Sequence, residues 1–255
     1  MPQPFGRKLA LSLSRRLACD LVHLAHSIPS VPVQRRVNVA ALVAAREASQ
    51  PRPSWCAIFA KALGMVAANR PELRRAFVDF PKAHLYEHPV SVAAIPVERH
   101  LDGDEAALFA RIAAPEQQAL VRLDAQLRAF EEQPLESLAA FRRALRISRW
   151  PRLLRRMVWW LNLGVSGGRR VRTLGTFAVC SFSDLGATAL HPLTPLAFTL
   201  DHGAIETDGM VEVRMVYDHR VTDGAQVARI LHDLERVLNC EILSELRYLR
   251  SADAA

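Results

Sequence analysis

The chain has 255 residues, of which 50% are hydrophobic and 23% are charged, so it is long enough and apolar enough to bury a sizeable core. Its formal net charge is +7 at pH 7. Most of the excess is arginine, because the only lysines are Lys8, Lys61 and Lys82. An arginine-rich surface favours phosphate-bearing or acidic partners: nucleic acid, anionic lipid, coenzyme A or an acidic carrier protein.

The cysteines and the apolar runs argue against several classes of protein. The four cysteines are widely spaced, at Cys19, Cys56, Cys180 and Cys240. No Cys-x-x-Cys pair occurs, which indicates neither a zinc site nor a disulfide framework, and reduced thiols in a cytoplasm are the simpler expectation. The N-terminal apolar run is short and is interrupted by Arg15 and Arg16, so a signal peptide is not expected. No run of about 18 apolar residues predicts a transmembrane helix.

In the first half of the chain, apolar residues that recur every three to four positions predict helices, and alternating ones predict strands. The expected helices cover 14–26, 40–49, 55–69, 71–76 and 115–132. The expected strands cover 31–39 and 89–98, whereas 106–112 is compatible with a strand or a helix. The helix at 55–69 is strongly apolar and therefore central, with Ser54 as its expected N-cap.

The stretch from about 135 to 172 is unusually basic, with arginines every three to four residues and with Trp150, Trp159 and Trp160 among its apolar residues. A basic amphipathic pattern with tryptophan at its edge predicts a helix on an anionic membrane surface, here over 142–161. The alternative is a helix packed on the domain with a solvated arginine face, and the residues leave both open. Nucleic acid is the less favoured partner, because no binding motif accompanies the charge.

The C-terminal part predicts a strand over 176–183, another at 197–200, and a hairpin turn at Asp208-Gly209 that leads into a buried strand. An amphipathic helix is expected over 225–238. His219 therefore lies where a buried strand stops and a turn begins. That placement suits a catalytic base, because the strand fixes the imidazole and its end opens onto a cleft. The alternative is a buried histidine that caps a strand, followed by an ordinary turn.

These residues together resemble a known family. The similarity lies in Thr176-Phe-Ala-Val-Cys-Ser to Leu185-Gly186, in the segment with Pro192 and Pro195, and in Asp-His-Arg-Val-Thr-Asp-Gly at 218–224. They resemble the catalytic domain of the dihydrolipoamide acyltransferase subunit of 2-oxoacid dehydrogenase complexes, over most of residues 12–245. The resemblance implies the chloramphenicol acetyltransferase-like fold, an α/β two-layer sandwich with a mixed sheet covered by helices. We expect one such domain over 1–255, with the basic stretch at about 135–172 as an insertion.

The resemblance also implies a homotrimer with active sites between subunits. His219 would be the general base, which takes a proton from a thiol, hydroxyl or amine that attacks a thioester. Acyl coenzyme A or an acyl carrier protein would supply the thioester, and no metal or prosthetic group is expected. Asp223 would hold the turn by pairing with Arg15 or Arg16, and Gly224 would let the chain turn tightly into the helix.

The family pattern has a serine or threonine hydroxyl that stabilises the oxyanion, and here the sequence departs from it. Aligned without gaps, that position is Cys180, whose thiol is a weak donor. Ser181 is adjacent, but it should point to the opposite face of the sheet and would serve only through a local bulge. A covalent intermediate on Cys180 is the least favoured alternative, because no second histidine is obviously placed to activate it.

The resemblance covers a catalytic domain, so we expect a stand-alone form without lipoyl and peripheral-subunit-binding domains. The first hypothesis is an acyltransferase with an unidentified acceptor, located in the cytoplasm, with peripheral membrane association left open. The alternative is a non-catalytic trimeric scaffold or assembly subunit, which Cys180 favours. A third hypothesis is a dehydrogenase-complex core served by a lipoyl domain on another chain.

Overall fold

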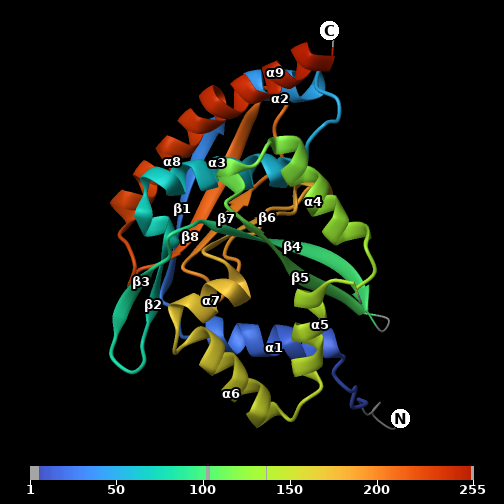
Figure 1. Cartoon of the computed structure of the whole chain (residues 1–255), viewed down its shortest axis with the longest axis vertical. Coiled ribbons are helices and arrows are strands. Elements are labelled where there is room, and N and C mark those ends of the chain that lie inside the picture. Colours follow the sequence, from blue (N-terminus) through green and yellow to red (C-terminus); the bar gives the residue numbers. More distant parts are fainter. Residues whose placement is uncertain (1–5, 102–103, 136, 254–255) are drawn as a thin grey trace, which may run out of the picture.

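The computed structural model describes residues 6–101, 104–135 and 137–253, and a six-stranded sheet lies at its centre (Figure 1). The strands are β1 (Ser30–Asn38), β4 (Val92–Leu101), β5 (Asp104–Ala113), β6 (Phe177–Ser181), β7 (Phe198–His202) and β8 (Met210–Asp218). They lie in the order β1-β8-β7-β6-β4-β5. β6 pairs in parallel with β4 and β7, and the remaining pairs are antiparallel. The sheet is therefore mixed, as expected.

One face of the sheet is covered by helices that pack around α3. These are α2 (Ala40–Glu47), α3 (Trp55–Asn69), α4 (Leu120–Glu132), α8 (Gly224–Val237) and α9 (Leu243–Asp253), the last two joined by a π-helical turn at Leu238–Ile242. α3 begins at its predicted N-cap, where the Ser54 hydroxyl accepts the Ala57 N–H at 3.2 Å. Its Phe59 and Leu63 are fully buried, in one core with Leu200 of the sheet. The sheet and the helices on this face form the α/β two-layer sandwich that the sequence predicts.

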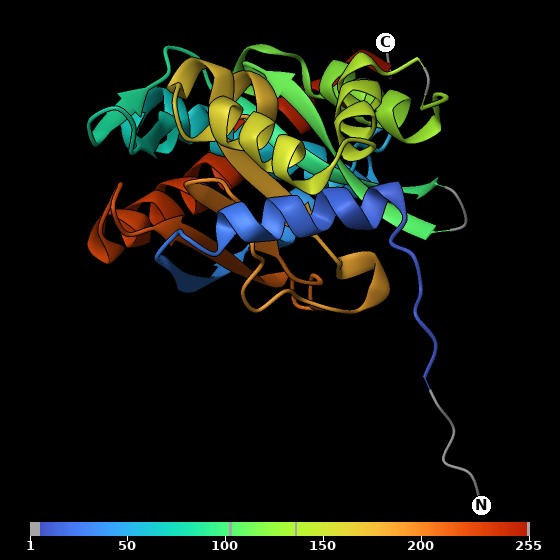
Figure 2. The same ribbon diagram turned by 90° about the horizontal axis from the view of Figure 1, so that it is seen from below.

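The opposite face carries α1 and three helices from the basic stretch, as Figure 2 shows. They are α1 (Leu13–Ala25), α5 (Ala139–Ser148), α6 (Arg152–Leu163) and α7 (Gly167–Leu174). Leu17, Phe141 and Trp159 form a second core there with Leu108 and Ala178 of the sheet. The basic stretch thus adds a helical layer to the predicted two-layer arrangement.

A buried ion pair fastens this added layer to the rest of the protein. Arg155 of α6 donates from Nε to Asp20 Oδ2 at 2.7 Å and from Nη2 to Asp20 Oδ1 at 3.2 Å. Both side chains are almost completely buried. A charge in such a place needs its partner, because neither group has water to solvate it. Arg155 is therefore a structural residue and not part of a solvated arginine face.

Three local features differ from the sequence expectations. The helical piece expected over 71–76 is a 3₁₀-helix only over Pro71–Arg74 (η1), and the chain then forms a hairpin of β2 (Arg75–Val78) and β3 (His84–Glu87) that was not predicted. The helix expected from 115 begins as a separate 3₁₀ turn, η2 (Pro115–Gln117), before α4. The loop expected around 164–170 contains α7, whose Gly167 packs so closely on Tyr86 that a Cβ would lie 2.0 Å from the ring.

The structure settles the open assignment of residues 106–112 and agrees with the expected turn before β8. Residues 106–112 lie within β5, where Ala106, Leu108 and Ala110 alternate with more exposed neighbours. The turn into β8 has Gly209 at φ 80°, and a Cβ there would lie 2.5 Å from Ala40. Glycine is required at this turn for both reasons. None of the helices in the described part of the chain combines the length and apolarity needed to cross a bilayer.

Candidate active site

His219 follows the last residue of β8, as the sequence predicts. Its backbone N–H donates to the Pro29 carbonyl at 3.1 Å, in the loop between α1 and β1. Its side chain is 50% exposed, and its ring centroid lies 5.7 Å from that of Tyr217. The backbone is thus fixed while the imidazole remains open to an incoming group. A general base requires both properties.

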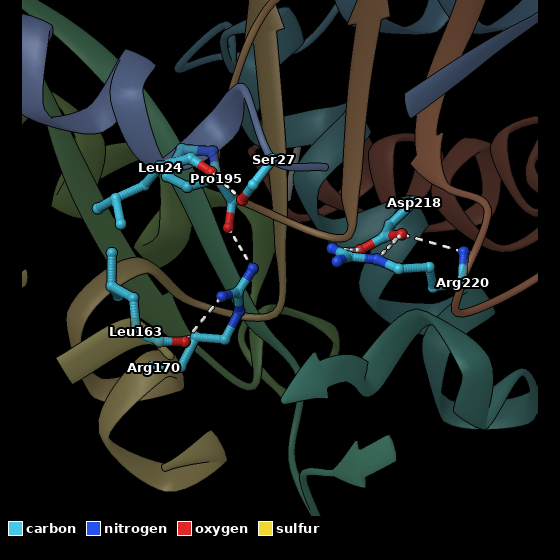
Figure 3. A network of polar contacts seen from close by, with 7 residues as sticks. All are labelled: Leu24, Ser27, Leu163, Arg170, Pro195, Asp218 and Arg220. Atoms are coloured by element: carbon cyan, nitrogen blue, oxygen red, sulfur yellow. Dashed lines mark hydrogen bonds and ion pairs between the residues drawn. The ribbon is translucent and has the colours of Figure 1, made fainter. Parts of the chain in front are cut away.

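The residues on either side of His219 form an ion pair. Asp218 is buried, and its carboxylate accepts the Arg220 side chain from Nε at 2.9 Å and from Nη2 at 2.7 Å (Figure 3). The backbone N–H of Arg220 also donates to Asp218, at 3.0 Å. The guanidinium lies 4.4 Å above the ring of Phe77 in β2, a cation–π distance. The buried carboxylate that holds this turn is therefore Asp218, for which no role was predicted.

Asp223, which was expected to hold the turn, is exposed. Its carboxylate Oδ1 lies 3.7 Å from His219 Nδ1, and its side chain is 75% exposed. That distance is too long for a hydrogen bond, and water screens the attraction between a protonated imidazole and the carboxylate. The attraction between Asp223 and His219 is therefore weak. It does not anchor the turn.

Neither Arg15 nor Arg16 pairs with Asp223, and this expectation is wrong for the described chain. Arg16 donates from Nε to the Leu11 carbonyl at 3.2 Å. Both arginines lie at the start of α1, whereas the His219 turn contacts Pro29, beyond the end of that helix. A 13-residue helix is about 20 Å long. The length of α1 therefore keeps Arg15 and Arg16 away from Asp223, the partner that was expected for one of them.

Gly224 is the first residue of α8, but its backbone is not in the left-handed region that favours glycine. The reason for glycine is a close contact, because an added Cβ would lie 3.2 Å from the Tyr217 hydroxyl oxygen. Glycine is thus explained by its close packing against Tyr217 and not by the conformation of a tight turn.

Arg170 in α7 is a buried charged residue near Asp218 and Arg220 that the sequence did not single out. It is buried and donates from Nη1 to the Leu163 carbonyl at 2.9 Å and from Nη2 to the Pro195 carbonyl (Figure 3). Burial lowers its pKa to about 10, while the nearby Asp218 favours the charged form. Arg170 is thus still protonated at neutral pH. It joins the basic stretch to the segment that leads into β7, next to the end of β8.

The two candidates for oxyanion stabilisation differ in their surroundings. The Cys180 thiol is buried and donates to the Leu200 carbonyl at 3.4 Å. Burial and the neighbouring Asp201 carboxylate raise the pKa of this thiol well above its usual range. A thiol held in its protonated form is a poor nucleophile. The covalent role considered for Cys180 therefore has no support from its environment.

Ser181 is half-buried, and its hydroxyl lies among several polar atoms. It is 2.8 Å from the Ser183 hydroxyl and 3.2 Å from the His202 carbonyl oxygen. Its Oγ also lies 3.4 Å from Nδ1 of His202, a buried imidazole that stacks on Phe59 with ring centroids 4.3 Å apart. The sequence did not predict a second histidine here. The signal for it is its register, since Ser181 pairs directly with His202 in the sheet.

Within one chain, His219 is far from both oxyanion candidates. Cys180 pairs with Asp201, and Asp201 with Arg214 on β8. His219 is five residues beyond Arg214, about 17 Å along the strand, and β8 is two strand spacings, about 10 Å, from β6. The separation is therefore about 20 Å for Cys180 and about 22 Å for Ser181, which lies opposite Val213 by the same register. The described residues also contain no group of three or more metal-ligating side chains close enough to hold an ion.

The chain is similar to one family model and to several solved structures. Residues 174–244 match the family model described as 2-oxoacid dehydrogenases acyltransferase (catalytic domain). A search of curated protein sequences gave no match. Among solved structures, dihydrolipoamide acetyltransferase of Azotobacter vinelandii is similar at 17% identity and a TM-score of 0.69, over 96% of this chain and 95% of that one.

Two further structures support the same fold. A truncated catalytic core of the 2-oxoacid dehydrogenase multienzyme complex from Thermoplasma acidophilum is similar at 17% identity and a TM-score of 0.67, over 92% of this chain and 99% of that one. A chloramphenicol acetyltransferase is similar at 12% identity and a TM-score of 0.53, over 91% of this chain and 100% of that one. The chain therefore has the fold of dihydrolipoamide acetyltransferase catalytic cores and of chloramphenicol acetyltransferase, and its residues 174–244 are similar to the catalytic domain of 2-oxoacid dehydrogenase acyltransferases.

Proposed function

We propose that the protein transfers an acyl group from a thioester, carried by coenzyme A or by a carrier protein, to a thiol, hydroxyl or amine acceptor. The observation that carries the proposal is the geometry of His219: a fixed backbone, a half-exposed imidazole, and a position inside the matched segment at the end of a buried strand. The acceptor is defined only by its chemistry: it is a nucleophile that can release one proton.

In this reaction the neutral imidazole of His219 takes the proton of the acceptor as the acceptor attacks the thioester carbonyl. The attack forms a tetrahedral intermediate, and its collapse breaks the carbon–sulfur bond and releases the thiol of the donor. The proton held by the imidazole then passes to the departing thiolate. The imidazole of His219 is then neutral again, and every proton and bond in the reaction is accounted for by the donor, the acceptor and His219.

The intermediate carries an oxyanion that needs a hydrogen-bond donor, worth about 3 kcal/mol. We propose Ser181 for this role, because its hydroxyl is partly exposed whereas the Cys180 thiol is buried on Leu200. Since Ser181 and His219 of one chain are about 22 Å apart by the strand register, they can act together only if each comes from a different subunit. A homotrimer with sites between subunits, as the family resemblance implies, supplies that arrangement.

The test is thiol release from an acyl coenzyme A in the presence of small thiol, hydroxyl and amine acceptors. His219→Ala should lower the transfer rate by roughly 10²–10⁴. Turnover that survives this substitution would contradict the proposed base. No thiol release by the wild-type protein from any donor would favour a non-catalytic scaffold instead.

We also propose that α6 lies on an anionic membrane surface. Its large exposed apolar side chains are Leu153, Leu154, Met157, Trp160 and Leu161. At 3.6 residues per turn they cover an arc of about 120°, which is wide for the solvent side of a helix. Phe80 of the β2–β3 hairpin extends this face, with its ring 5.5 Å from that of Trp160.

Charge favours a lipid surface over a second copy of the chain as the partner of α6. Residues 137–174 contain ten arginines and no aspartate or glutamate. A two-fold contact between two such faces would bring like charges together. Anionic headgroups instead attract each nearby arginine by about 1 kcal/mol, while the apolar arc enters the boundary with the acyl chains.

Vesicle co-sedimentation tests this association. The wild-type protein should bind vesicles of phosphatidylcholine with phosphatidylglycerol and should bind pure phosphatidylcholine only weakly. Replacing Leu153, Met157 and Trp160 by serine should lower binding at least about tenfold. The matched control replaces Leu190 and Leu193 by serine, two leucines that are exposed in the segment before β7 and outside α6. Equal binding by both variants, or a change in oligomeric mass in the α6 variant, would contradict the membrane role.

A further inference from the structure

A cavity of about 120 Å³ lies on the second face of the sheet, between β5 and the helices α1, α5, α6 and α7. Its apolar wall is formed by Leu17, Leu21, Leu108, Phe141, Ile147 and Trp159. An apolar cavity of about 150 Å³ is known to accept benzene. This one therefore has room for an aliphatic chain of about four to six carbons or for a small ring.

Three arginines line the same cavity, each from a different element: Arg111 of β5, Arg143 of α5 and Arg172 of α7. An adjoining hollow shares Arg143 and Arg172 and adds Arg169. Among the described residues, none of these four guanidinium groups makes an ion pair or a hydrogen bond. Some arginines elsewhere in the described chain do have partners, as Arg155 and Arg220 show.

The local charges around the half-buried Arg111 favour an anion at this place. Arg111 is half-buried, and its pKa is lowered by burial and, second, by the positive charge of Arg143. The polar groups beside the arginines are already engaged with the backbone, since Asn162 donates to the Val158 carbonyl at 2.7 Å and Thr173 to the Arg169 carbonyl at 2.8 Å. On α1, the carboxylate of Asp20 is held by Arg155. A phosphate or carboxylate would relieve the repulsion through charge-assisted hydrogen bonds.

We propose that this arginine-rimmed cavity, defined by Arg111, Arg143 and Arg172 above the apolar wall, binds an amphiphilic anion. The short aliphatic or aromatic group of the ligand fills the apolar pocket, and its phosphate or carboxylate lies among the guanidinium groups. The cavity is a second site, separate from the proposed base: β5 is four strand spacings from β8, or about 19 Å. It goes beyond the proposed acyl transfer and does not depend on it.

Hexyl phosphate is a suitable probe, because it has a six-carbon chain and a dianionic head. Its binding can be followed by calorimetry and by the fluorescence of Trp159, with inorganic phosphate and hexanol as the two partial probes. We expect hexyl phosphate to bind at least about tenfold more tightly than either, because only it uses both halves of the cavity. Equal affinity for hexanol or for inorganic phosphate would overturn the proposal.

Two sets of variants distinguish the binding of the phosphate group from the binding of the hexyl group. Arg143→Gln with Arg172→Gln should weaken hexyl phosphate binding at least about tenfold, whereas the matched pair Arg146→Gln with Arg149→Gln, exposed on α5 but outside the cavity, should change it less than about twofold. Ala144→Trp should fill the pocket and abolish hexyl phosphate binding while leaving weak phosphate binding intact.

Thermal melting of each variant shows whether the fold is kept, and the exposed Arg143 and Arg172 have no bonds to lose. His219→Ala should bind hexyl phosphate like the wild-type protein, so failure of the proposed acyl transfer would leave this result unchanged. The proposal is wrong if the Arg143/Arg172 variant binds like the wild-type protein, or if the control pair loses as much affinity.

Discussion

Arg220 donates two hydrogen bonds to the carboxylate of Asp218, at 2.9 and 2.7 Å, and His219 is the single residue between them. Side chains two positions apart at a strand end lie on the same side, so the histidine between them points the other way. The ion pair thus fixes the backbone on one side and leaves the imidazole on the other. Its carboxylate is 1% exposed, which protects the pair from competing water.

Asp218→Asn should therefore affect the rate through the position of His219. We expect kcat to fall about tenfold, since a displaced catalytic group costs rate, with little change in KM. Unfolding in urea should show a loss of about 1–3 kcal/mol, because Arg220 loses its charged partner while it is still partly solvated. The control is Asp208→Asn in the β7–β8 turn, far from His219. A fall in stability with kcat unchanged would make the pair structural only.

Mixing two inactive variants should restore activity if the site is shared between subunits. His219→Ala and Ser181→Ala trimers would each lack one partner at every site. Random reassembly of equal amounts should give about a quarter of the sites with both residues intact. Transfer assays before and after co-refolding measure the recovery. If activity does not return although mixed trimers form, both residues act within one chain or Ser181 has no role.

The buried Asp201 should make stability depend on pH. Burial raises its pKa to about 6, so the folded protein holds a proton that the unfolded chain releases at a lower pH. Stability from this group is therefore present below about pH 4 and is lost as the pH rises to about 6. Asp201→Asn should be about 3 kcal/mol more stable than the wild-type protein near pH 7.5 and nearly equal near pH 4.

Urea unfolding at the two pH values measures this difference. The exposed Asp79→Asn serves as the matched control, and it should shift stability little at either pH. A stability difference for Asp201→Asn that is the same at both pH values would mean that the carboxyl does not titrate in this window.

Breaking the Asp20–Arg155 pair should be costly, whereas replacing both partners should not. Arg155→Met leaves a buried carboxylate without its partner and should cost about 3–5 kcal/mol. Arg155→Met combined with Asp20→Leu should recover most of the loss, because apolar groups of similar size often replace a buried pair without penalty. A double variant as unstable as the single one would show that the two side chains act independently.

Periodicity and turn chemistry predicted much of the fold. Gly209 marks a hairpin by its conformation, Ser54 caps α3, and the end of β8 is where the apolar run stops. These are local signals, so the sequence carries them. The β2–β3 hairpin is less readable, because only Ala76 and Val78 alternate as buried residues over its first, four-residue strand.

The candidate site was harder to predict, because its contacts are long-range. Nothing near Asp218 or Asp223 in the sequence says which carboxylate is buried, and that depends on Phe77 and on the helix that carries Arg170. The expected Arg15 or Arg16 partner failed for the same reason, since the helix length keeps both away from the turn. The position of His219 itself follows from local pattern, and it was predicted.

The Asp20–Arg155 pair joins residues 135 positions apart, and this spacing bears on how the chain is made. α1 leaves the ribosome early, but α5 and α6, which pack against its apolar side, are synthesised much later. At about 5–20 residues per second, Leu17 and its neighbours wait between about 7 and 27 seconds for their partners. During that interval α1 presents an uncovered apolar stripe to the cell, which makes the nascent chain a natural client for ribosome-associated chaperones.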